Sequence, residues 1–273
     1  MNAKLLIIDP QNDFCDIPGA ALPVSGSNAD LQRLAAFMSH ERERISDITV
    51  TLDSHASVGI QRTTFWSTGG GEPVEPFTQI TATDVRAGRF QPCDPARSAG
   101  VLSYLDALER GGRYHLIAWP VHCVLGTWGH NVHSGVAAEL ASWELETQRS
   151  ATRALKGLNP MTEQYSAVQA EVPDARDPST QTNQALIECV RPNGGLLLVA
   201  GEAASHCVAA TVQHLFAALS AEQRRRVIIL RDCMSAVAGF ESQAAHLFEQ
   251  AQAQGARVMI AAEARAVLAK DRT

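Results

Sequence analysis

The chain of 273 residues is 45% hydrophobic and 19% charged and carries a formal net charge of -6, which is typical of a globular protein with an ample core. Lysine and arginine are scattered and form no basic stripe, so the composition argues against nucleic-acid binding. A strand pattern begins within the first few residues, and no run of about 18 consecutive apolar residues follows. We therefore expect a cytoplasmic protein without a signal peptide, a membrane-spanning helix or a membrane partner.

The first apolar run, KLLIID at residues 4–9, predicts a strand that is buried on both faces of a parallel sheet. Asp9 then lies at the carboxyl end of this strand, where ligands bind in open α/β sheets. A turn-rich segment with Phe14 follows. Residues 25–44 show helical spacing of apolar positions, which predicts a helix whose core side chains are Leu31, Leu34, Phe37 and Met38.

A second strand, predicted over residues 45–55, runs out into Asp53 and His55. With one residue between them at a strand end, an aspartate and a histidine can direct an oxygen and an imidazole nitrogen at one cation. The alternative is a pair that satisfies itself in the loop. The segment 120–133 holds His122, His130 and His133, so a third ligand could come from there.

Residues 56–97 are predicted to form a long irregular excursion with three consecutive glycines, four prolines and the aromatic residues Phe65, Trp66 and Phe77. Loops of this length inside a compact domain are usually functional lids or disordered, and the aromatic residues favour a packed lid. A helix over 96–112 and a strand over 114–119 follow.

A helix over 134–146 precedes a less apolar strand that ends in Lys156. A lysine after a strand is ordinarily a solvated charge, so this position alone indicates no function. Residues 157–183 form a second irregular region, predicted to be lid-like, in which Tyr165 is the only aromatic residue. A helix over 181–191 follows this region.

The most apolar run of the chain, GLLLVAG at residues 195–201, leads to Cys207 at an expected strand-to-helix turn. A thiol there lies near the first N–H groups of a helix, whose partial charge would lower its pKa and favour nucleophilic chemistry. The alternative is a buried structural cysteine. None of the six cysteines forms a C-x-x-C pair, which favours reduced thiols over disulfides or a zinc finger.

The remaining pattern is a strand over 226–232, a helix over 240–254, a strand over 256–261 and a closing helix. Alternating strands and helices at these spacings imply right-handed crossovers and a parallel sheet covered on both faces. We therefore predict an α/β fold formed by a single domain over residues 1–273, without repeats or an internal boundary.

Three short motifs, in chain order LLIIDPQNDF, ALKG and GEAASHCV, resemble the catalytic motifs of the isochorismatase-like cysteine hydrolases, the superfamily of nicotinamidase and N-carbamoylsarcosine amidase. A fourth segment, WPVHCVLGTWG, is similar to the nicotinamidase segment that supplies a metal-binding histidine. The resemblance extends from about residue 4 to residue 261. It implies a three-layer α/β/α fold with a six-stranded parallel sheet in the order 3-2-1-4-5-6.

The resemblance also implies roles for particular residues. The catalytic triad would be Asp9, Lys156 and Cys207. The oxyanion hole would be formed by the backbone N–H groups of Ala203 and Cys207, with a non-proline cis peptide near Glu202 and Ala203. A divalent metal (zinc, iron or manganese) would be bound by Asp53, His55 and His122.

The predicted reaction is hydrolysis of a small, nicotinamide-like carboxamide to a carboxylate and ammonia through a thioester. Phe14, Trp119 and Tyr165 are candidates for an aromatic wall that binds this substrate, although each could instead be core. Ser205 and Glu202 stand where nicotinamidases usually have an aspartate and an apolar residue, so the resemblance extends to the triad but does not identify the substrate pocket. We expect a homo-oligomer whose partner is this small-molecule amide.

Two other functions remain open at this point. A ureido or carbamoyl substrate, of the N-carbamoylsarcosine or biuret type, would need the same triad and a more polar pocket with Arg62 or Arg86. A non-catalytic binding protein or a thiol redox sensor that uses Cys207 would need neither Asp9 nor Lys156.

Overall fold

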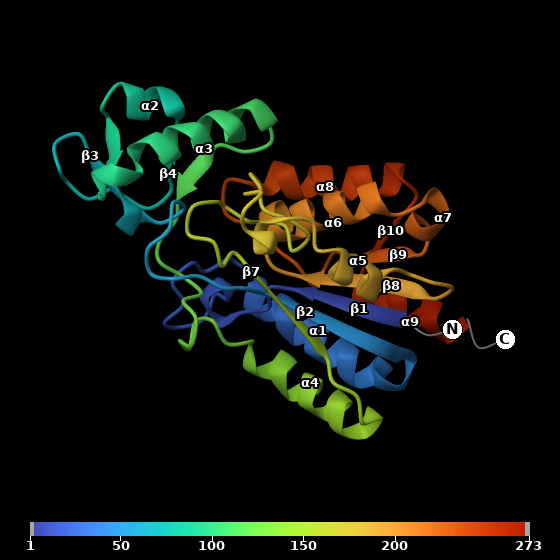
Figure 1. Cartoon of the computed structure of the whole chain (residues 1–273). Helices are drawn as coiled ribbons and strands as arrows, with labels where there is room; N and C mark the ends of the chain where they lie inside the picture. Colours follow the sequence, from blue (N-terminus) through green and yellow to red (C-terminus); the bar gives the residue numbers. More distant parts are fainter. Residues whose placement is uncertain (1–2, 271–273) are drawn as a thin grey trace.

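The computed structural model describes residues 3–270 and is built on one six-stranded parallel sheet (Figure 1). The strands lie in the order β10-β9-β8-β1-β2-β7. Numbered along the chain within this sheet, that order is the predicted 3-2-1-4-5-6, which is therefore confirmed. The strands are β1 (Ala3–Ile8), β2 (Ile45–Asp53), β7 (Thr152–Lys156), β8 (Leu196–Gly201), β9 (Val227–Leu230) and β10 (Arg257–Met259).

Helices cover both faces of the sheet, as expected for strands that are apolar on both sides (Figure 1). Alternate residues of β1 point to opposite faces, so that Leu5 packs in one core and Leu6 in the other. The core around Leu5 is closed by α1 (Ser27–Glu41), α4 (Ser134–Thr147) and α9 (Ala261–Lys270). The core around Leu6 is closed by α5 (Gln184–Val190), α6 (Ala209–Ala218) and α8 (Glu241–Ala253), and a short α7 (Ala221–Arg224) precedes β9.

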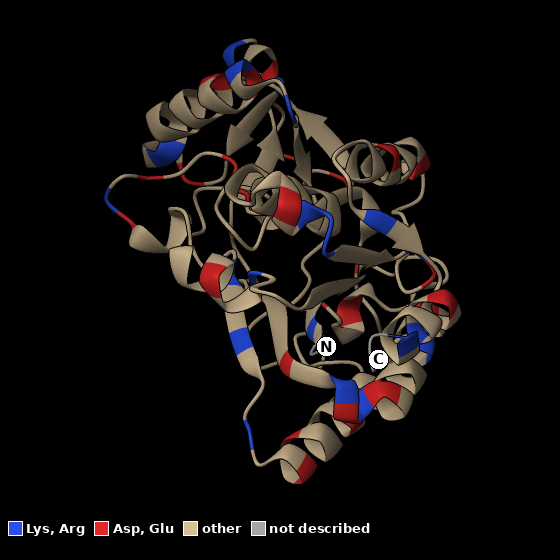
Figure 2. Ribbon diagram, turned by 90° about the vertical axis from the view of Figure 1, so that its right-hand side faces the viewer, with Lys and Arg blue, Asp and Glu red and all other residues tan. Residues whose placement is uncertain are grey.

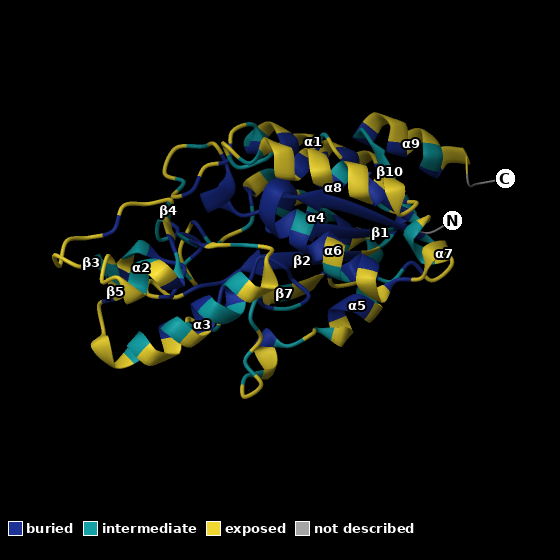
Figure 3. Cartoon of the chain, turned by 90° about the horizontal axis from the view of Figure 1, so that it is seen from above, coloured by how far each residue is buried: buried dark blue, intermediate teal, exposed yellow. Residues whose placement is uncertain are grey.

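The burial pattern agrees with the predicted core of α1. Leu31, Leu34, Phe37 and Met38 are all buried. In Figure 3 the central strands are almost entirely buried, whereas the outward faces of the helices are exposed. Within residues 3–270, none of the helices combines the length and the apolar character that crossing a bilayer requires.

The excursion after β2 folds into a small packed unit beside the sheet, at the upper left of Figure 1. Its elements are β3 (Trp66–Thr68), β4 (Thr78–Ile80), α2 (Ala82–Arg86) and β5 (Phe90–Pro92), followed by α3 (Ser98–Gly111) and β6 (Leu116–Ala118). The expectation of an irregular segment is wrong here, because β3 pairs with β5 and β4 with β6 in antiparallel ribbons. Strands of three residues are too short to show a period in the sequence.

This unit has its own hydrophobic core, in which Phe65 and Trp66 are buried while Phe77 is exposed. The strand predicted over 114–119 belongs to this unit rather than to the central sheet. Residues 157–183, in contrast, contain one 3-10 turn (Pro178–Thr180) as their only helix or strand. Acidic and basic residues are interspersed along the chain in the view of Figure 2.

Candidate active site

Asp9, Lys156 and Cys207 come together at the carboxyl ends of the central strands. Asp9 follows β1, Lys156 ends β7, and Cys207 follows β8, which lies next to β1 in the sheet. Lys156 Nζ lies 3.0 Å from Asp9 Oδ2 and 3.5 Å from Cys207 Sγ. All three residues are buried. The strand order therefore brings three side chains that are far apart in sequence within contact of one another.

Asp9 is held by the neighbouring strand β2. Its backbone N–H donates to the Thr51 carbonyl oxygen at 3.1 Å, and the Thr51 hydroxyl donates to Asp9 Oδ1 at 2.5 Å. The other carboxylate oxygen faces Lys156. Burial raises the pKa of Asp9, and the charge of Lys156 offsets only part of this effect. A carboxylate with a raised pKa is a stronger base than an exposed aspartate.

Lys156 bridges two carboxylates rather than extending into solvent. In addition to Asp9, its Nζ contacts Asp53 Oδ1 at 2.7 Å and the Gln164 carbonyl oxygen at 3.1 Å. Burial disfavours the charged form, but Asp53 and Asp9 outweigh burial and raise the pKa of Lys156 well above its usual value. Gly157 follows at φ +77°, and a Cβ there would lie 2.4 Å from His55 Cε1. The glycine of the ALKG motif is thus required for the close approach of His55.

Cys207 lies in a π-helical turn (Ala204–Val208) that continues into α6. The expectation that the helix terminus lowers its pKa is wrong. Burial raises the pKa of Cys207 well above its usual value, and the charge of Lys156 does not compensate for burial and for the two nearby carboxylates. The resting thiol is therefore protonated, and a base is needed to make it nucleophilic.

The peptide bond between Glu202 and Ala203 is cis, as the resemblance implied. The neighbouring backbone donors are engaged, because Glu202 N–H donates to the Ile8 carbonyl oxygen and Ala204 N–H to that of Ser235, both at 2.8 Å. Among residues 3–270, the Ala203 N–H donates no hydrogen bond. This donor is therefore available to the carbonyl oxygen of a ligand beside Cys207. The Cys207 N–H, the second donor expected in the oxyanion hole, remains a prediction.

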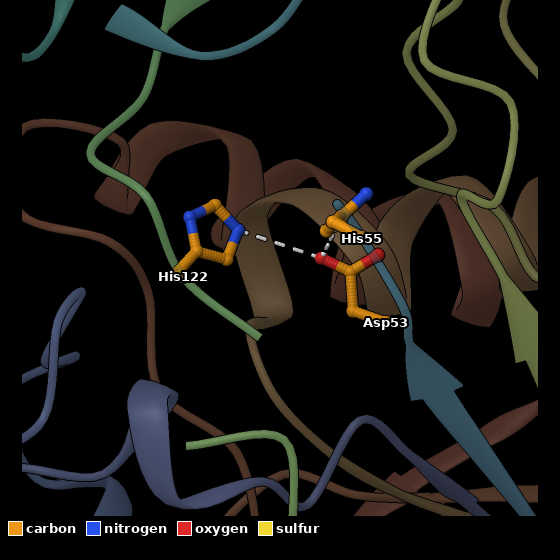
Figure 4. A group of neighbouring side chains, drawn as sticks. All are labelled: Asp53, His55 and His122. Atoms are coloured by element: carbon orange, nitrogen blue, oxygen red, sulfur yellow. Dashed lines mark ion pairs between the residues drawn. The ribbon is translucent and has the colours of Figure 1, made fainter. Parts of the chain in front are cut away.

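Asp53, His55 and His122 form a cluster with one potential ligand atom from each residue, and these atoms lie within 4.8 Å of one another (Figure 4). Asp53 Oδ2 is 2.8 Å from His55 Nε2 and 3.5 Å from His122 Nε2. His55 Nδ1 lies 2.9 Å from the Gly157 carbonyl oxygen, and His122 Nδ1 lies 2.8 Å from that of Pro120. When Nδ1 donates to a carbonyl, Nε2 keeps the lone pair that can bind a cation.

The protonation state of His55 and His122 is also the one that metal binding requires. Burial lowers the pKa of both, that of His122 to about 3, so both imidazoles are neutral at neutral pH. Neutral imidazole is the form that binds a metal, and one oxygen with two nitrogens suits zinc, iron or manganese. His130 and His133 do not join this cluster, because their Nε2 atoms contact Ser54 Oγ and Asn28 Oδ1.

Arg62 also borders the cluster. This residue is fully buried, and its Nη1 lies 2.5 Å from His122 Nδ1 and 3.0 Å from His122 Nε2, while its Nε and Nη2 have no hydrogen-bond partner among the described residues. The sequence suggested Arg62 only as a substrate residue, because the course of the excursion could not be predicted. Arg86, the other suggested arginine, is half exposed on the small unit and pairs with Asp106 at 2.6 Å, so it does not reach the pocket.

We expect purified protein to contain about one zinc, iron or manganese ion per chain, and His122→Ala to lose it, because two ligands remain of three. Elemental analysis of the two proteins measures this. His130→Ala is the matched control, since it removes a nearby histidine outside the cluster. Equal metal content in wild type and His122→Ala would contradict the assignment.

A pocket opens beside Cys207, and the three residues predicted for the aromatic wall, Phe14, Trp119 and Tyr165, all line it. Trp119 Nε1 donates to the Tyr165 hydroxyl at 3.2 Å, which holds the two rings in place. Sequence reasoning missed several lining residues that lie in irregular segments or beside Cys207. They are Leu22, Val24, Gln61, Glu163, His206 and Val237.

His206 and Glu163 are the titratable members of this missed group. The His206 ring packs against both Trp119 and Tyr165, at centroid distances of 5.4 and 5.2 Å, and burial lowers its pKa to about 4. Burial raises the pKa of Glu163 to about 7. His206 could have been suspected from its position next to Cys207, whereas no pattern in the sequence marks Glu163.

No family model matches the chain, and the comparison with curated proteins gives no match. Solved structures do share its architecture. An Acinetobacter baumanii nicotinamidase and pyrazinamidase superposes with a TM-score of 0.60 at 18% identity, over 96% of this chain and 97% of the other. The yeast nicotinamidase gives 0.61 at 21% identity, over 94% and 99%.

A zinc complex of the pyrazinamidase from Pyrococcus horikoshii gives a TM-score of 0.54 at 18% identity, over 95% of this chain and 99% of the other. An isochorismatase family protein from Desulfovibrio vulgaris gives 0.54 at 19% identity, over 98% of each chain. The order of the central strands and these superpositions agree over nearly the whole chain. The chain therefore has the isochorismatase-like hydrolase fold of the nicotinamidases and pyrazinamidases.

Proposed function

We propose that the chain is a cysteine-dependent amidohydrolase that cleaves a small carboxamide to a carboxylate and ammonia. The observation that carries this proposal is the buried contact of Lys156 Nζ with both Asp9 and Cys207, at the edge of an aromatic pocket. Hydrolysis of small amides by the nicotinamidases and the pyrazinamidase of the same fold supports it.

In the proposed reaction, Asp9 takes the proton of the Cys207 thiol and the thiolate attacks the carbonyl carbon of the amide. The Ala203 N–H stabilises the oxyanion of the tetrahedral intermediate. The proton held by Asp9 passes to the leaving nitrogen, so that ammonia departs and a thioester remains. Water, deprotonated by Asp9, then attacks the thioester, and the thiol is released together with the carboxylate product.

Lys156 has a positioning and electrostatic role in this proposal. Its charge lies 3.5 Å from Cys207 Sγ, where it stabilises the thiolate as the proton moves to Asp9. Its second carboxylate partner, Asp53, keeps the ammonium group in place from the other side. Burial raises the pKa of Asp9, so its carboxylate is a stronger base toward the thiol than an exposed aspartate would be.

The three cluster residues would hold a divalent metal beside the pocket, where it would supply Lewis-acid polarisation and substrate orientation. Asp53 belongs both to the cation cluster and to the surroundings of the catalytic lysine, because its Oδ1 contacts Lys156 while its Oδ2 faces the two histidines. Removing this carboxylate would therefore disturb the lysine and the cluster together.

A thiol redox sensor is a weaker proposal for the same cysteine. Redox sensors use exposed thiols with a lowered pKa, whereas Cys207 is buried and burial raises its pKa. A ureido or carbamoyl amide is a stronger alternative, since the pocket is lined by Gln61 and Glu163 as well as by aromatic rings.

The experiment that tests the proposed function is ammonia release by the purified protein from nicotinamide, pyrazinamide, biuret and carbamoyl amino acids. We expect release from at least one of these compounds. Absence of release from all of them, by protein whose metal content and folding have been verified, would contradict the proposal.

A further inference from the structure

One acidic residue that lines the pocket has a carboxylate oxygen without a hydrogen-bond partner among the described residues. Glu163 lines the same pocket as Cys207, is only 5% exposed, and its Oε2 is buried without a hydrogen bond. A buried acceptor that lacks a donor destabilises a protein, so such an atom usually has a ligand or a water as its partner. The proposed reaction uses Asp9, Lys156 and Cys207 and leaves Glu163 without a role.

The orientation of the Glu163 carboxyl group is fixed by its other oxygen. Oε1 accepts a hydrogen bond from the Gln164 N–H at 2.9 Å. The backbone is held as well, because the Glu163 carbonyl oxygen accepts from the Glu171 N–H at 2.9 Å and the Glu163 N–H donates to the Tyr104 hydroxyl at 3.0 Å. Oε2 is therefore a positioned acceptor rather than the end of a mobile side chain.

We propose that Glu163 is a specificity-determining residue that accepts a hydrogen bond, through Oε2, from an N–H group that the substrate carries beside its scissile amide. This inference rests on the proposed amidohydrolase function and narrows its substrates to amides with a second nitrogen donor, such as an amino or ureido group. An analogue with a methyl group in that place would fill the same space and leave Oε2 without a partner.

The conservative substitution Glu163→Gln gives a sharp test because of the Gln164 contact. The amide oxygen of the new side chain should take the place of Oε1, since the Gln164 N–H needs an acceptor there. The amide NH2 would then stand where Oε2 was. The substitution thus exchanges an acceptor for a donor with almost no change of volume, and an N–H group of the substrate would face another N–H group.

Two pairs of compounds differ only by an amino group in place of a methyl group: biuret with acetylurea, and 3-aminobenzamide with 3-methylbenzamide. At a pH well above 7, where the Glu163 carboxyl with its pKa of about 7 is ionised, we expect wild type to favour the amino member of at least one pair. The expected preference in kcat/KM is about 100-fold or more, since a site built to bind a donor rejects the analogue that lacks it. Glu163→Gln should lower this preference by about tenfold or more.

Glu171→Gln is the matched control. Glu171 is also a buried acid whose pKa is raised to about 7 by burial and whose Oε1 has no partner, but it does not line the pocket. Its substitution should leave the preference unchanged. The metal content of Glu163→Gln should also equal that of wild type, and a loss of metal would assign Oε2 to the cation cluster instead and overturn the proposal.

Binding to Cys207→Ala separates this proposal from the proposed function. Calorimetry with the same four compounds needs no turnover, so the preference for an amino member can be measured even if none is hydrolysed. Three results would each overturn the role of Glu163. The two members of each pair could bind with equal affinity, neither amino compound could bind, or the preference could persist in the double variant Cys207→Ala/Glu163→Gln. If the protein binds an amino compound preferentially but hydrolyses none of the four compounds, the result contradicts the proposed amidohydrolase function and not the role of Glu163.

Discussion

Replacing Cys207 with alanine is expected to abolish amide hydrolysis while the protein stays folded. The substitution removes the thiol in contact with Lys156 and deletes a single sulfur atom from the pocket wall. Loss of a catalytic nucleophile lowers kcat by several orders of magnitude, on the order of 10⁶-fold in the best-studied hydrolases. Ammonia release, measured beside thermal unfolding of each protein, checks this expectation.

Cys123→Ala is the control for this substitution. Cys123 is equally buried, and burial also raises its pKa, but it does not line the pocket. Its removal should therefore leave most of the activity. Wild-type turnover in Cys207→Ala, or loss of activity in Cys123→Ala alone, would show that the nucleophile has been assigned to the wrong residue.

Removing either charged partner of Cys207 is expected to have the next largest effect. Asp9→Asn has no basic form at the position of the base, and the expected fall in kcat is about 10²- to 10⁴-fold. Lys156→Met leaves the carboxylates of Asp9 and Asp53 facing one another without a cation, so it should lower activity and also destabilise the fold by about 3 to 5 kcal/mol. Turnover and denaturant unfolding measure the two effects.

Arg153→Met is the matched control for the lysine. Arg153 precedes Lys156 on the same edge strand and pairs with Glu144 at 3.0 Å, but its side chain is nearly half exposed. Such surface pairs contribute little to stability, so both activity and unfolding should stay close to wild type. Equal behaviour of the arginine and lysine variants would contradict the role of Lys156.

The Asp9 variant also tests whether Asp9 activates the thiol. In the proposed reaction Asp9 accepts the proton of Cys207, so Asp9→Asn lacks the group that generates the thiolate. Alkylation of Cys207 by iodoacetamide at neutral pH should then be slower in Asp9→Asn than in wild type, in parallel with the slower turnover. An alkylation rate that is unchanged across pH would show that Asp9 does not activate Cys207.

Much of the fold could be predicted because its signals are local. Buried parallel strands give continuous apolar runs, and KLLIID and GLLLVAG correspond to the central strands β1 and β8. Glycine after Lys156 is another local signal, since the approach of His55 leaves no room for a Cβ. The proximity of Asp9, Lys156 and Cys207, in contrast, depends on the order of the strands in the sheet. This order is predicted only from the resemblance of the motifs to a known superfamily.

Two features of the candidate site could not be predicted correctly from the sequence, and each has a physical reason. The pKa of Cys207 was predicted from the helix terminus alone, and burial reverses the direction of the shift. Arg62 and Glu163 lie in segments without a regular period, so the sequence does not indicate that Arg62 borders the cation cluster, that Glu163 lines the pocket or that parts of both are buried without partners. Glu163, the residue proposed to select the substrate, is thus one that the sequence pattern does not mark.

The most direct test of the account is covalent bond formation at Cys207 in solution. An aldehyde analogue of the best amide substrate, labelled with 13C at its carbonyl carbon, forms a thiohemiacetal with an activated thiol. In the NMR spectrum, wild type and Cys123→Ala should both convert the carbonyl signal into that of a tetrahedral carbon, and Cys207→Ala should not. A tetrahedral signal that persists in Cys207→Ala, or that is absent from wild type under saturating aldehyde, would contradict the proposed cysteine mechanism.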